Sequence, residues 1–387
     1  MDLWTRWGLR HAIALCSRSI KRAAASASPL VPLRSRSASI PIYISEAMLS
    51  LKLISAVLLA TAQLIFAVTV PPPDAVIVSQ NPISTYKGAV AAVGNRTVFP
   101  SLSAAINSTN PKLAAYIFLY PGTYKEQAII RRKAPLRVVG YSPADTDYRA
   151  NTVLITASTN AIVVGSNDKS ATISVHNDDT VLQNINVENS WVGNQAIALS
   201  LYGARIGVYG CQLLGWQDTL LTNDGTHFFG KTLIVGAVDY IFGQRSRAFF
   251  QKCDMTSSRS GWVTASGVDT VNNTGVYVFN YCTVGKTKNA EATAEGGVYL
   301  GRPWREYAHV VWMRSNLSSV INPAGWAKWG ATDNPVHTQY YEYNNVGPGA
   351  DLSKRVNFSR TLTIAEAKKY EIANVLGTPA WWETRYQ

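Results

Sequence analysis

Two aspartates in this chain have the residue type and the spacing for paired acid and nucleophile chemistry. Asp218 lies in the run Trp216–Leu220 (WQDTL), and Asp239 lies twenty-one positions further on, in Gly236–Gly243 (GAVDYIFG). In a coiled parallel sheet, one turn of the coil returns the chain to about 4.8 Å from where it started. Two carboxylates one turn apart then face the same patch of solvent, where one can transfer a proton while the other attacks a substrate.

The interval between the two aspartates is also a local repeat length. Short β-rich runs recur without helical spacing between them, and they align on one column of residues: Ile185, Cys211, Thr232, Cys253, Cys282 and Ser315. The successive differences in residue number, 26, 21, 21, 29 and 33, are typical of stacked coils with loop insertions. Asp218 and Asp239 each follow their column residue by seven positions, so we expect them in register on neighbouring coils. An ordinary β-sandwich with strands of similar length is the alternative fold.

Length and charge separate a leader from one long domain. A solenoid can use most of 387 residues as a single domain, and 47% hydrophobic residues supply an ample core. We expect a leader at 1–70 and one β-helix domain at 71–387. The leader holds eight Lys or Arg and two acids, so it carries +6 of the net +12 and leaves +6 for the domain. A mildly basic domain suits nucleic acid or a polyanionic sugar, although such a charge also serves solubility alone.

The leader contains the pattern of a secretory signal that begins at Met48. Residues 1–46 are rich in Arg, Ser and Ala, as in a transit peptide, whereas Lys52 precedes an apolar run over 53–70 that Pro71 ends. We expect a secreted, extracellular protein, with 1–47 absent from the secreted form or an artefact of gene prediction. If uncleaved, the same run is a marginal membrane anchor. Five glycosylation sequons fit secretion: Asn95, Asn107, Asn272, Asn316 and Asn357.

The cysteines and histidines give no pattern of a metal site. Cys211, Cys253 and Cys282 share the core column, where Cys behaves as a small buried hydrophobe. Cys253 and Cys282 fall on adjacent coils, which leaves a disulfide between them open. The chain has no CxxC motif and its five histidines are scattered, so we expect no metal and no cofactor.

The sequence changes character after residue 333, beyond the β-rich body that we expect over 96–330. The run Tyr341–Gly349 (YEYNNVGPG) predicts a loop. Thr363–Val375 (TIAEAKKYEIANV) has helical composition, with Thr363 as a cap and Gly377 as a stop. We therefore expect an all-β solenoid with a short C-terminal helical segment that closes one end or lies along its side.

Six motifs follow one another along the chain: Gly122–Glu126 (GTYKE), Gln195–Leu199 (QAIAL), Gln217–Leu220 (QDTL), Asp239–Gly243 (DYIFG), Leu300–Trp304 (LGRPW) and Gly325–Trp329 (GWAKW). In this order they resemble the pectin methylesterase (pectinesterase) family, and its fungal and microbial members more than its plant members. The resemblance covers about residues 86–350. It implies a right-handed parallel β-helix and the hydrolysis of methyl esters of homogalacturonan (pectin) to methanol and pectate.

The resemblance also implies roles for five residues. Asp239 would be the nucleophile that forms an acyl-enzyme, and Asp218 would protonate departing methanol and then activate water. Gln217 and Gln195 would donate to the oxyanion, because a neutral amide stabilises developing charge without neutralising the nucleophile. Arg302 would orient Asp239 and hold it ionised, while the closeness of the two carboxylates keeps one protonated. A ladder of glutamines within the stack is the alternative for the two amides.

Two aromatic residues are candidate substrate-binding groups. Trp304 could stack on a sugar ring, and Phe242 is a second platform for which a core role is equally open. Leu221 stands where many relatives carry Tyr, Gln244 stands where Asn is frequent, and Asn167 falls near a substrate-contacting Thr of plant forms. Substrate preference is therefore open. For partners, the resemblance implies pectin, with no nucleic acid, no stable membrane association and a monomeric protein.

Two other functions share some of these features. A pectate lyase would need acidic residues around calcium and a basic proton acceptor, and Arg302 aimed at the aspartates would compete with that metal. A non-catalytic sugar-binding or adhesive β-helix would need aromatics but not the aspartate pair with its glutamines. Activity that survives a chelator distinguishes the first alternative, and methanol release distinguishes the second.

Overall fold

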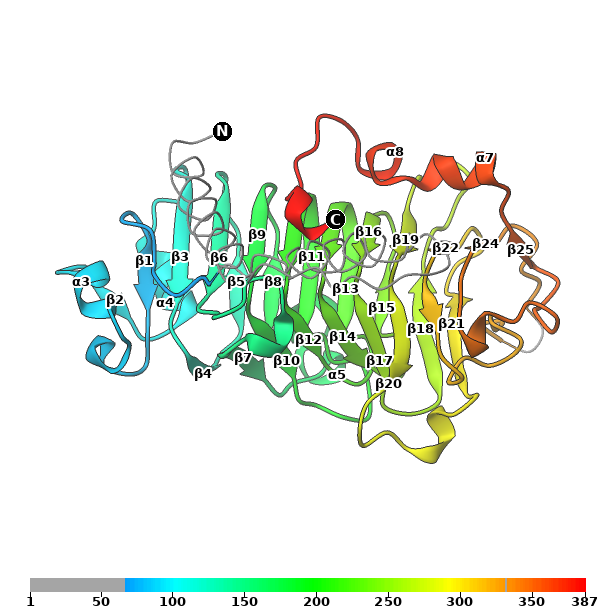
Figure 1. Ribbon diagram of the computed structural model, residues 1–387, viewed down its shortest axis with the longest axis horizontal. Coiled ribbons are helices and arrows are strands. Elements are labelled where there is room, and N and C mark those ends of the chain that lie inside the picture. The colour runs from blue at the N-terminus through cyan, green and yellow to red at the C-terminus, as the bar shows by residue number, and fades with distance from the viewer. Residues whose placement is uncertain (1–66, 331–332) are drawn as a thin grey trace, which may run out of the picture. The chain divides into compact units, whose positions relative to one another are not determined.

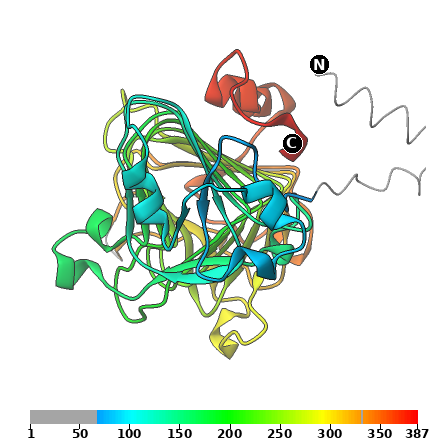
Figure 2. The same ribbon diagram turned by 90° about the vertical axis from the view of Figure 1, so that its left-hand side faces the viewer.

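The computed structural model describes residues 67–330 and 333–387, which form a parallel β-helix (Figure 1). Figure 2 looks at this coil from its N-terminal end and shows the strands of successive turns lying behind one another around a common interior. Within the described residues, every pairing between named strands is parallel, for example β12 with β14 and β14 with β17. The predicted all-β solenoid is confirmed.

The strands form two sheets, one with eight strands and one with 17. The smaller sheet contains β4 (Gly122–Lys125), β7 (Val153–Ala157), β10 (Asn186–Asn189), β12 (Gln212–Leu214), β14 (Leu233–Gly236), β17 (Asp254–Ser257), β20 (Thr283–Lys286) and β23 (Asn316–Leu317). The larger sheet contains β1 (Val76–Val78), β2 (Val98–Phe99), β3 (Ala115–Leu119), β5 (Ala128–Ile130), β6 (Leu136–Gly140), β8 (Ile173–Val175), β9 (Thr180–Gln183), β11 (Leu199–Tyr209), β13 (Leu220–Gly230), β15 (Ile241–Gly243), β16 (Arg247–Gln251), β18 (Gly261–Ser266), β19 (Val276–Asn280), β21 (Val298–Pro303), β22 (His309–Met313), β24 (Gln339–Tyr343) and β25 (Ser359–Thr361).

Each coil crosses the larger sheet twice and the smaller sheet once. The start of β11 pairs with β8 and its end pairs with β9, so this long strand runs through both arms of the larger sheet. Short helices decorate the coils: α3 (Ala89–Val93), α4 (Leu102–Ser108), α5 (Ala161–Val164), α6 (Asn167–Ser170), α7 (Ile364–Ala367) and α8 (Ile372–Leu376), with 3-10 turns at η1 (Ile83–Thr85), η2 (Tyr148–Ala150), η3 (Ala292–Ala294), η4 (Pro348–Ala350), η5 (Lys368–Tyr370) and η6 (Thr384–Tyr386).

The register of the smaller sheet confirms the predicted column and its steps. Leu213 pairs with Ile234, and Ile234 pairs with Met255, so the chain advances by the shortest predicted step at each of these two coils. Each column residue lies two positions before such a strand residue, and all six are at most 1% exposed. The residue before each of them has positive φ: Asn184, Gly210, Lys231, Lys252, Tyr281 and Arg314. The column therefore marks the turn between the two sheets, and the β-sandwich alternative is wrong.

Like side chains stack on one another through the interior of the coil. Phe229, Phe250, Phe279 and Trp312 form a continuous series with ring centroids 4.4, 4.4 and 3.9 Å apart. Each stacked pair contributes about 0.5–1.5 kcal/mol beyond its buried area. Cys253 and Cys282 are buried free thiols in the same core, so the open question of a disulfide between them is answered against it.

The β-helix extends past residue 330, where the sequence predicted a change. Residues 341–343 were expected in a loop, but they belong to β24, which pairs with β22 and β25. Glu342 is only 3% exposed in this strand. Arg355 compensates the buried charge, because its Nε and Nη2 donate to the Glu342 carboxylate at 2.7 and 3.0 Å. The loop prediction was wrong for 341–343 because this paired charge resembles a surface residue, whereas 344–347 lie in no helix or strand.

The predicted C-terminal helix is broken into three short pieces, α7, η5 and α8. Thr363 caps α7 in a capping box with Glu366, and Gly377 ends α8, as expected. The pieces lie along the side of the coil rather than over its end (Figure 1). Val375 and Leu376 of α8, together with Trp382 further along the chain, cover an outer apolar surface of the coil.

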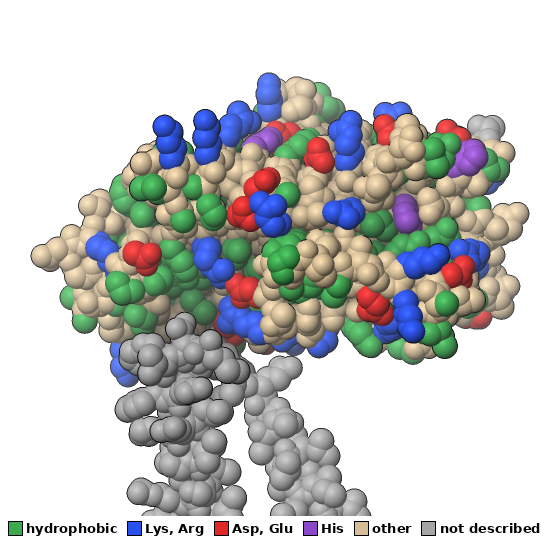
Figure 3. Space-filling view, turned by 90° about the horizontal axis from the view of Figure 1, so that it is seen from above, with side chains coloured by type: hydrophobic (Ala, Val, Ile, Leu, Met, Phe, Trp, Pro, Cys, Tyr) green, Lys and Arg blue, Asp and Glu red, His purple; other side chains and the backbone are tan. Residues whose placement is uncertain are grey.

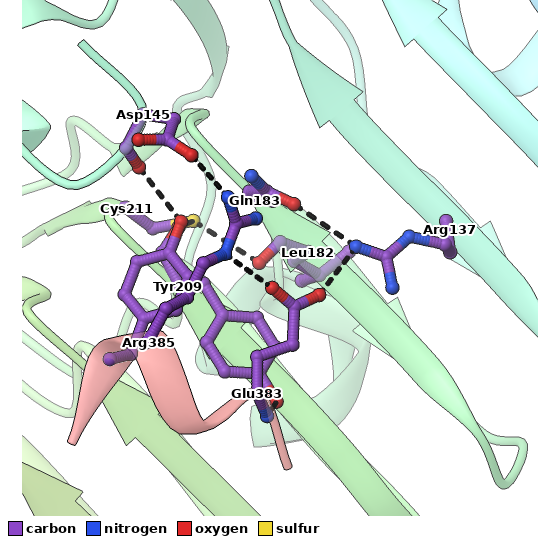
Figure 4. Close-up of polar contacts among 9 residues, drawn as sticks. Arg137, Asp145, Leu182, Gln183, Tyr209, Cys211, Glu383 and Arg385 are labelled. Carbon is purple, nitrogen blue, oxygen red and sulfur yellow. Dashed lines mark hydrogen bonds and ion pairs between the residues drawn. The ribbon is translucent and has the colours of Figure 1, made fainter. Parts of the chain in front are cut away.

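The last residues fasten this segment to distant coils (Figure 4). Arg385 pairs with the buried Asp145, and Arg137 donates to Glu383 at 2.6 Å. The Tyr386 hydroxyl donates to the Asp145 carbonyl at 2.8 Å. The C-terminal segment is therefore held by charge pairing as well as by apolar contact.

Basic and acidic side chains are interspersed on the face of the molecule that is seen from above (Figure 3).

Most of the predicted leader lies outside the described residues, including Met48, so the secretory signal and the boundary at residue 70 stay predictions. In the ranges that the structure does describe, no helix is both long enough and apolar enough to cross a bilayer.

Candidate active site

Asp218 and Asp239 lie at the turn that leads from the smaller sheet into the larger one. Asp218 separates β12 from β13, and Asp239 separates β14 from β15. Both residues adopt left-handed backbone conformations, with φ of 65° and 49°, which aspartate tolerates better than most residues. The Asp218 amide donates to the carbonyl of Val238 at 3.0 Å, and Gln217 bridges to Val238 in parallel register. The two aspartates therefore occupy neighbouring coils, as their spacing suggested.

The two carboxylates are nearly buried, whereas the spacing alone led us to expect them open to solvent. Asp218 is 6% exposed and Asp239 is 5% exposed. The expectation was wrong because side chains from later coils project over the turn. Arg302, on β21, contacts Asp239 in this way.

Arg302 reaches Asp239 from two strands away. Phe242 on β15 is in register with Ala265 on β18, and Ala265 is in register with Arg302. Arg302 Nε and Nη2 then donate to Oδ1 and Oδ2 of Asp239 at 2.9 and 2.6 Å, which is a bidentate pair.

Two tryptophans hold the Arg302 guanidinium between their faces. Its central carbon lies 3.6 Å from the ring centroid of Trp262 and 4.2 Å from that of Trp329. Such cation–π contacts stabilise the planar cation where water is excluded. Sequence reasoning assigned no role to either tryptophan. Trp329 lay within a quoted motif, and Trp262 could have been found only from the strand register.

Burial and charge shift the two carboxyl groups to different degrees. Burial raises the pKa of Asp218 well above its ordinary value, and the neighbouring Asp239 carboxylate raises it further, while Arg302 opposes both. Burial also raises the pKa of Asp239, against the lowering effect of its hydrogen bonds and charge contact with Arg302. Arg302 thus does not bring Asp239 below its ordinary range, but it favours the ionised form of Asp239 over that of Asp218.

The two candidate glutamines stack beside the carboxylates. Gln195 bridges to Gln217 in parallel register, and both side chains are partly exposed. Neither side-chain amide hydrogen-bonds to a residue that the structure describes. A true amide ladder looks different in this fold, because Asn280 Nδ2 donates to Gln251 Oε1 at 2.9 Å between neighbouring coils. The amides of Gln195 and Gln217 are therefore free to donate to a ligand.

The aromatic candidates form one small apolar cluster next to this site. Phe242 is 4% exposed and packs with Leu221, Ala265 and the partly buried Trp304. The rings of Phe242 and Trp304 lie 6.1 Å apart in a tilted arrangement. Trp304 therefore offers more surface to a ligand than Phe242 does. Two other residues singled out in the sequence are Asn167, which starts α6, and Gln244, which follows β15.

Two hollows lie on either side of the Arg302 guanidinium. The larger, of about 860 Å³, contains Trp329 and Trp304 in its lining. The smaller, of about 380 Å³, contains Trp262, Trp216 and Tyr299.

No group of three or more His, Cys, Asp or Glu side chains arranged to hold a metal occurs in residues 67–330 and 333–387. The arrangement instead combines two adjacent carboxyl groups, of which only Asp239 is paired with Arg302, and two amides without a partner among the described residues. These are the parts needed to attack a carbonyl, stabilise the oxyanion and protonate a leaving group.

Comparisons with known proteins identify the family of this chain. The Pectinesterase family model matches residues 88–378. The chain is 39% identical over 290 residues to pectinesterase A of Emericella nidulans, which covers 75% of this chain and 85% of that protein. The crystal structure of the pectin methylesterase from Aspergillus niger is similar with a TM-score of 0.71 and 34% identity, covering 81% of this chain and 97% of that one. The carrot pectin methylesterase gives a TM-score of 0.68 at 26% identity, covering 80% and 94%.

Proposed function

The chain belongs to the pectinesterase family, a family of esterases that hydrolyse methyl esters of pectin, and we propose that Asp239 and Asp218 carry this reaction as nucleophile and proton donor. The substrate is methyl-esterified homogalacturonan, and the products are methanol and pectate. One observation carries the assignment of roles: Arg302 makes its bidentate pair with Asp239 alone, so the two adjacent carboxylates are not equivalent.

In the first step, an ionised oxygen of Asp239 attacks the carbonyl carbon of the methyl ester. Negative charge develops on the carbonyl oxygen, and the side-chain amides of Gln217 and Gln195 donate to it. The carbon–oxygen bond to the methoxy group then breaks, and Asp218 gives its proton to the departing methanol. An acyl-enzyme on Asp239 and an ionised Asp218 remain.

In the second step, the ionised Asp218 removes a proton from a water molecule that attacks the acyl carbon. The bond to Asp239 breaks, which restores the aspartate and releases galacturonic acid, and the new carboxyl group then loses its proton to solvent. Asp218 has regained its proton, so the pair is ready for another turn. Arg302 stabilises the charge of Asp239 at the beginning and at the end of this cycle.

Methanol release from methyl-esterified homogalacturonan tests the proposal. We expect the wild-type protein to release methanol in the presence of a chelator, and Asp239→Ala to lose turnover to the background rate. A melting temperature close to that of the wild type shows that this variant is folded. Turnover by folded Asp239→Ala within tenfold of the wild type would contradict the role of Asp239, and activity that needs calcium would favour lyase-type chemistry.

We further propose that the protein acts outside the cell as a monomer, without stable membrane association and without nucleic acid. The exposure of all five sequon asparagines supports a secretory route, because each side chain is accessible to glycosylation: Asn95, Asn107, Asn272, Asn316 and Asn357. N-terminal sequencing of the extracellular protein tests this proposal. A mature chain that keeps residues before Met48 would contradict it.

A further inference from the structure

The two tryptophans beside Arg302 come from the coils on either side of it. Trp262 lies on β18, which pairs with β21, and its ring lies 6.4 Å from that of Tyr299, the residue in register with it. Trp329 lies in the coil that follows, where Trp326 bridges to β21 in parallel register. The guanidinium is therefore approached from both neighbouring coils, and neither tryptophan belongs to the strand that carries the arginine.

Both faces and one edge of the Arg302 guanidinium are in use. Trp262 and Trp329 cover the faces at 3.6 and 4.2 Å, and Asp239 accepts along the edge at 2.9 and 2.6 Å. An unrestrained arginine side chain has many rotamers, whereas a bidentate pair requires the planar fork to lie in the plane of the carboxylate. Two flat rings at these distances confine the guanidinium to one plane, and in that plane it reaches both oxygens of Asp239.

Stacking on a sugar ring is the other role open to Trp329, which is 42% exposed and lines the larger hollow. A sugar and a guanidinium cannot occupy the same face of an indole ring, so the face turned to Arg302 is not available to a ligand. Trp304 lines the same hollow but lies against Phe242 and Arg305 instead. The two tryptophans of this hollow therefore differ in what their rings contact.

We propose that Trp262 and Trp329 are positioning residues of the reaction, which hold Arg302 in the plane of its pair with Asp239 and so keep the nucleophile ionised in the free enzyme. This inference rests on the proposed function, because it concerns Asp239 as the nucleophile of that reaction. Both tryptophans act through the arginine rather than on the ester.

The groups that face Asp239 determine the direction of the effect. Burial raises the pKa of Asp239, and Arg302 lowers it through hydrogen bonds and charge. Burial also raises the pKa of its neighbours Asp218 and Tyr340 well above their ordinary values. Among these groups only Arg302 favours the ionised form of Asp239. A loosened arginine thus raises the pKa of Asp239, and the acid limb of the kcat/KM profile moves to higher pH.

The pH profile of kcat/KM for methanol release from a methyl-esterified galacturonate oligomer tests this inference. Trp329→Leu keeps an apolar side chain and removes the aromatic face. We expect the midpoint of its acid limb to move to higher pH, with kcat/KM below that midpoint about tenfold lower than in the wild type. Trp329→Phe keeps a ring and should restore most of the profile, and Trp262→Leu should move the midpoint in the same direction as Trp329→Leu.

Trp304→Leu is the matched control, because it removes the other tryptophan of the larger hollow. It should raise KM and leave the midpoint where it is. A rise in KM at an unchanged midpoint in Trp329→Leu would overturn the inference, since Trp329 would then be a platform for the substrate. A midpoint that moves to lower pH would also overturn it, because the tryptophans would then act by keeping water from Asp239.

A carbon-13 NMR titration of Asp239, assigned with Asp239→Asn, follows the same ionisation without turnover. We expect the pKa of Asp239 to be higher in Trp329→Leu than in the wild type. An unchanged pKa in the folded variant would overturn the inference whether or not the protein releases methanol. If the pKa rises but the wild-type protein releases no methanol, the proposed function fails instead. Trp262→Leu serves for both measurements if Trp329→Leu does not fold.

Discussion

The two turns that join the sheets use the same backbone conformation for opposite purposes. At the column turn, Lys252 and Tyr281 have φ of 52° and 54°, and at the carboxylate turn, Asp218 has φ of 65°. Ser315, behind one of the column turns, is paired: its Oγ accepts from the Cys282 amide at 3.1 Å and donates to the Met313 carbonyl at 2.9 Å. The Asp218 carboxyl is also buried, yet no residue that the structure describes hydrogen-bonds to it.

Polar groups are buried at both turns, so burial alone does not distinguish them. What differs is whether the buried group has a hydrogen-bond partner. A buried polar group with a partner stabilises the stack, whereas one without a partner costs free energy and keeps its chemistry available. The coil thus repeats one geometry, and the residue placed on it determines whether the turn contributes stability or reactivity.

Replacing the acid of the carboxylate turn should have the largest effect. Asp218→Asn keeps the shape of the side chain and removes its proton transfer. We expect kcat for methanol release to fall by about 10²–10⁴-fold. A fall of less than tenfold would mean that Asp218 does not transfer the proton, and that the contrast between the turns has no catalytic meaning.

The free amides should matter next. Gln217→Ala removes a donor that has no partner within the described residues, so its loss should raise the energy of the transition state. We expect kcat to fall by about 10²–10³-fold. A rise in KM at unchanged kcat would instead make Gln217 a residue that binds the ground state. Gln251→Ala, in the amide ladder, is the control whose effect should be on stability alone.

The same Asp218→Asn substitution should raise stability at neutral pH. The pKa of Asp218 is raised in the folded protein, so the folded state holds a proton that the unfolded chain has released. Wild-type stability therefore falls as pH rises from the unfolded pKa of about 3.9 through the folded pKa. Asn carries no such cost, so we expect the variant to be more stable than the wild type above that range and equally stable below it. Denaturant unfolding as a function of pH measures this gain, and equal pH dependence in both proteins would refute it.

Removing a partner at the column turn should do the reverse. Ser315→Ala leaves the Cys282 amide without its acceptor, so we expect a loss of about 1–2 kcal/mol in the free energy of unfolding. Methanol release should stay at the wild-type level, because the residue lies at the other turn of the coil. A stability that rises, or a kcat that falls tenfold in the folded variant, would break the contrast between the turns.

Much of this fold could be predicted from the sequence because the coil repeats. The column residues gave the register of the smaller sheet, and the offset of seven positions put Asp218 and Asp239 on neighbouring coils. β24 escaped prediction because Glu342 occupies a buried position only through its pair with Arg355. A prediction from periodicity judges each residue by its own type, so it does not detect a charge that is compensated by a residue of another coil.

The pairing of the two aspartates could be predicted from the sequence, but the side chains that bury them could not. Arg302 belongs to a motif, yet its path past Ala265 to Asp239 depends on the register of three strands. A tryptophan is more often a core residue than a site residue. Only the fold shows that Trp262 and Trp329 lie on the two faces of the guanidinium. The burial of the carboxylates follows from that cover, so spacing alone led to the wrong expectation.

The central claim is that adjacent carboxyl groups differ in ionisation because Arg302 binds Asp239 alone. A carbon-13 NMR titration of the aspartate carboxyl groups tests it most directly, with the two signals assigned from Asp218→Asn and Asp239→Asn. We predict that Asp239 ionises first as pH rises and that Asp218 keeps its proton over the range in which the enzyme is active. A titration in which Asp218 ionises before Asp239 would contradict the assignment of nucleophile and acid.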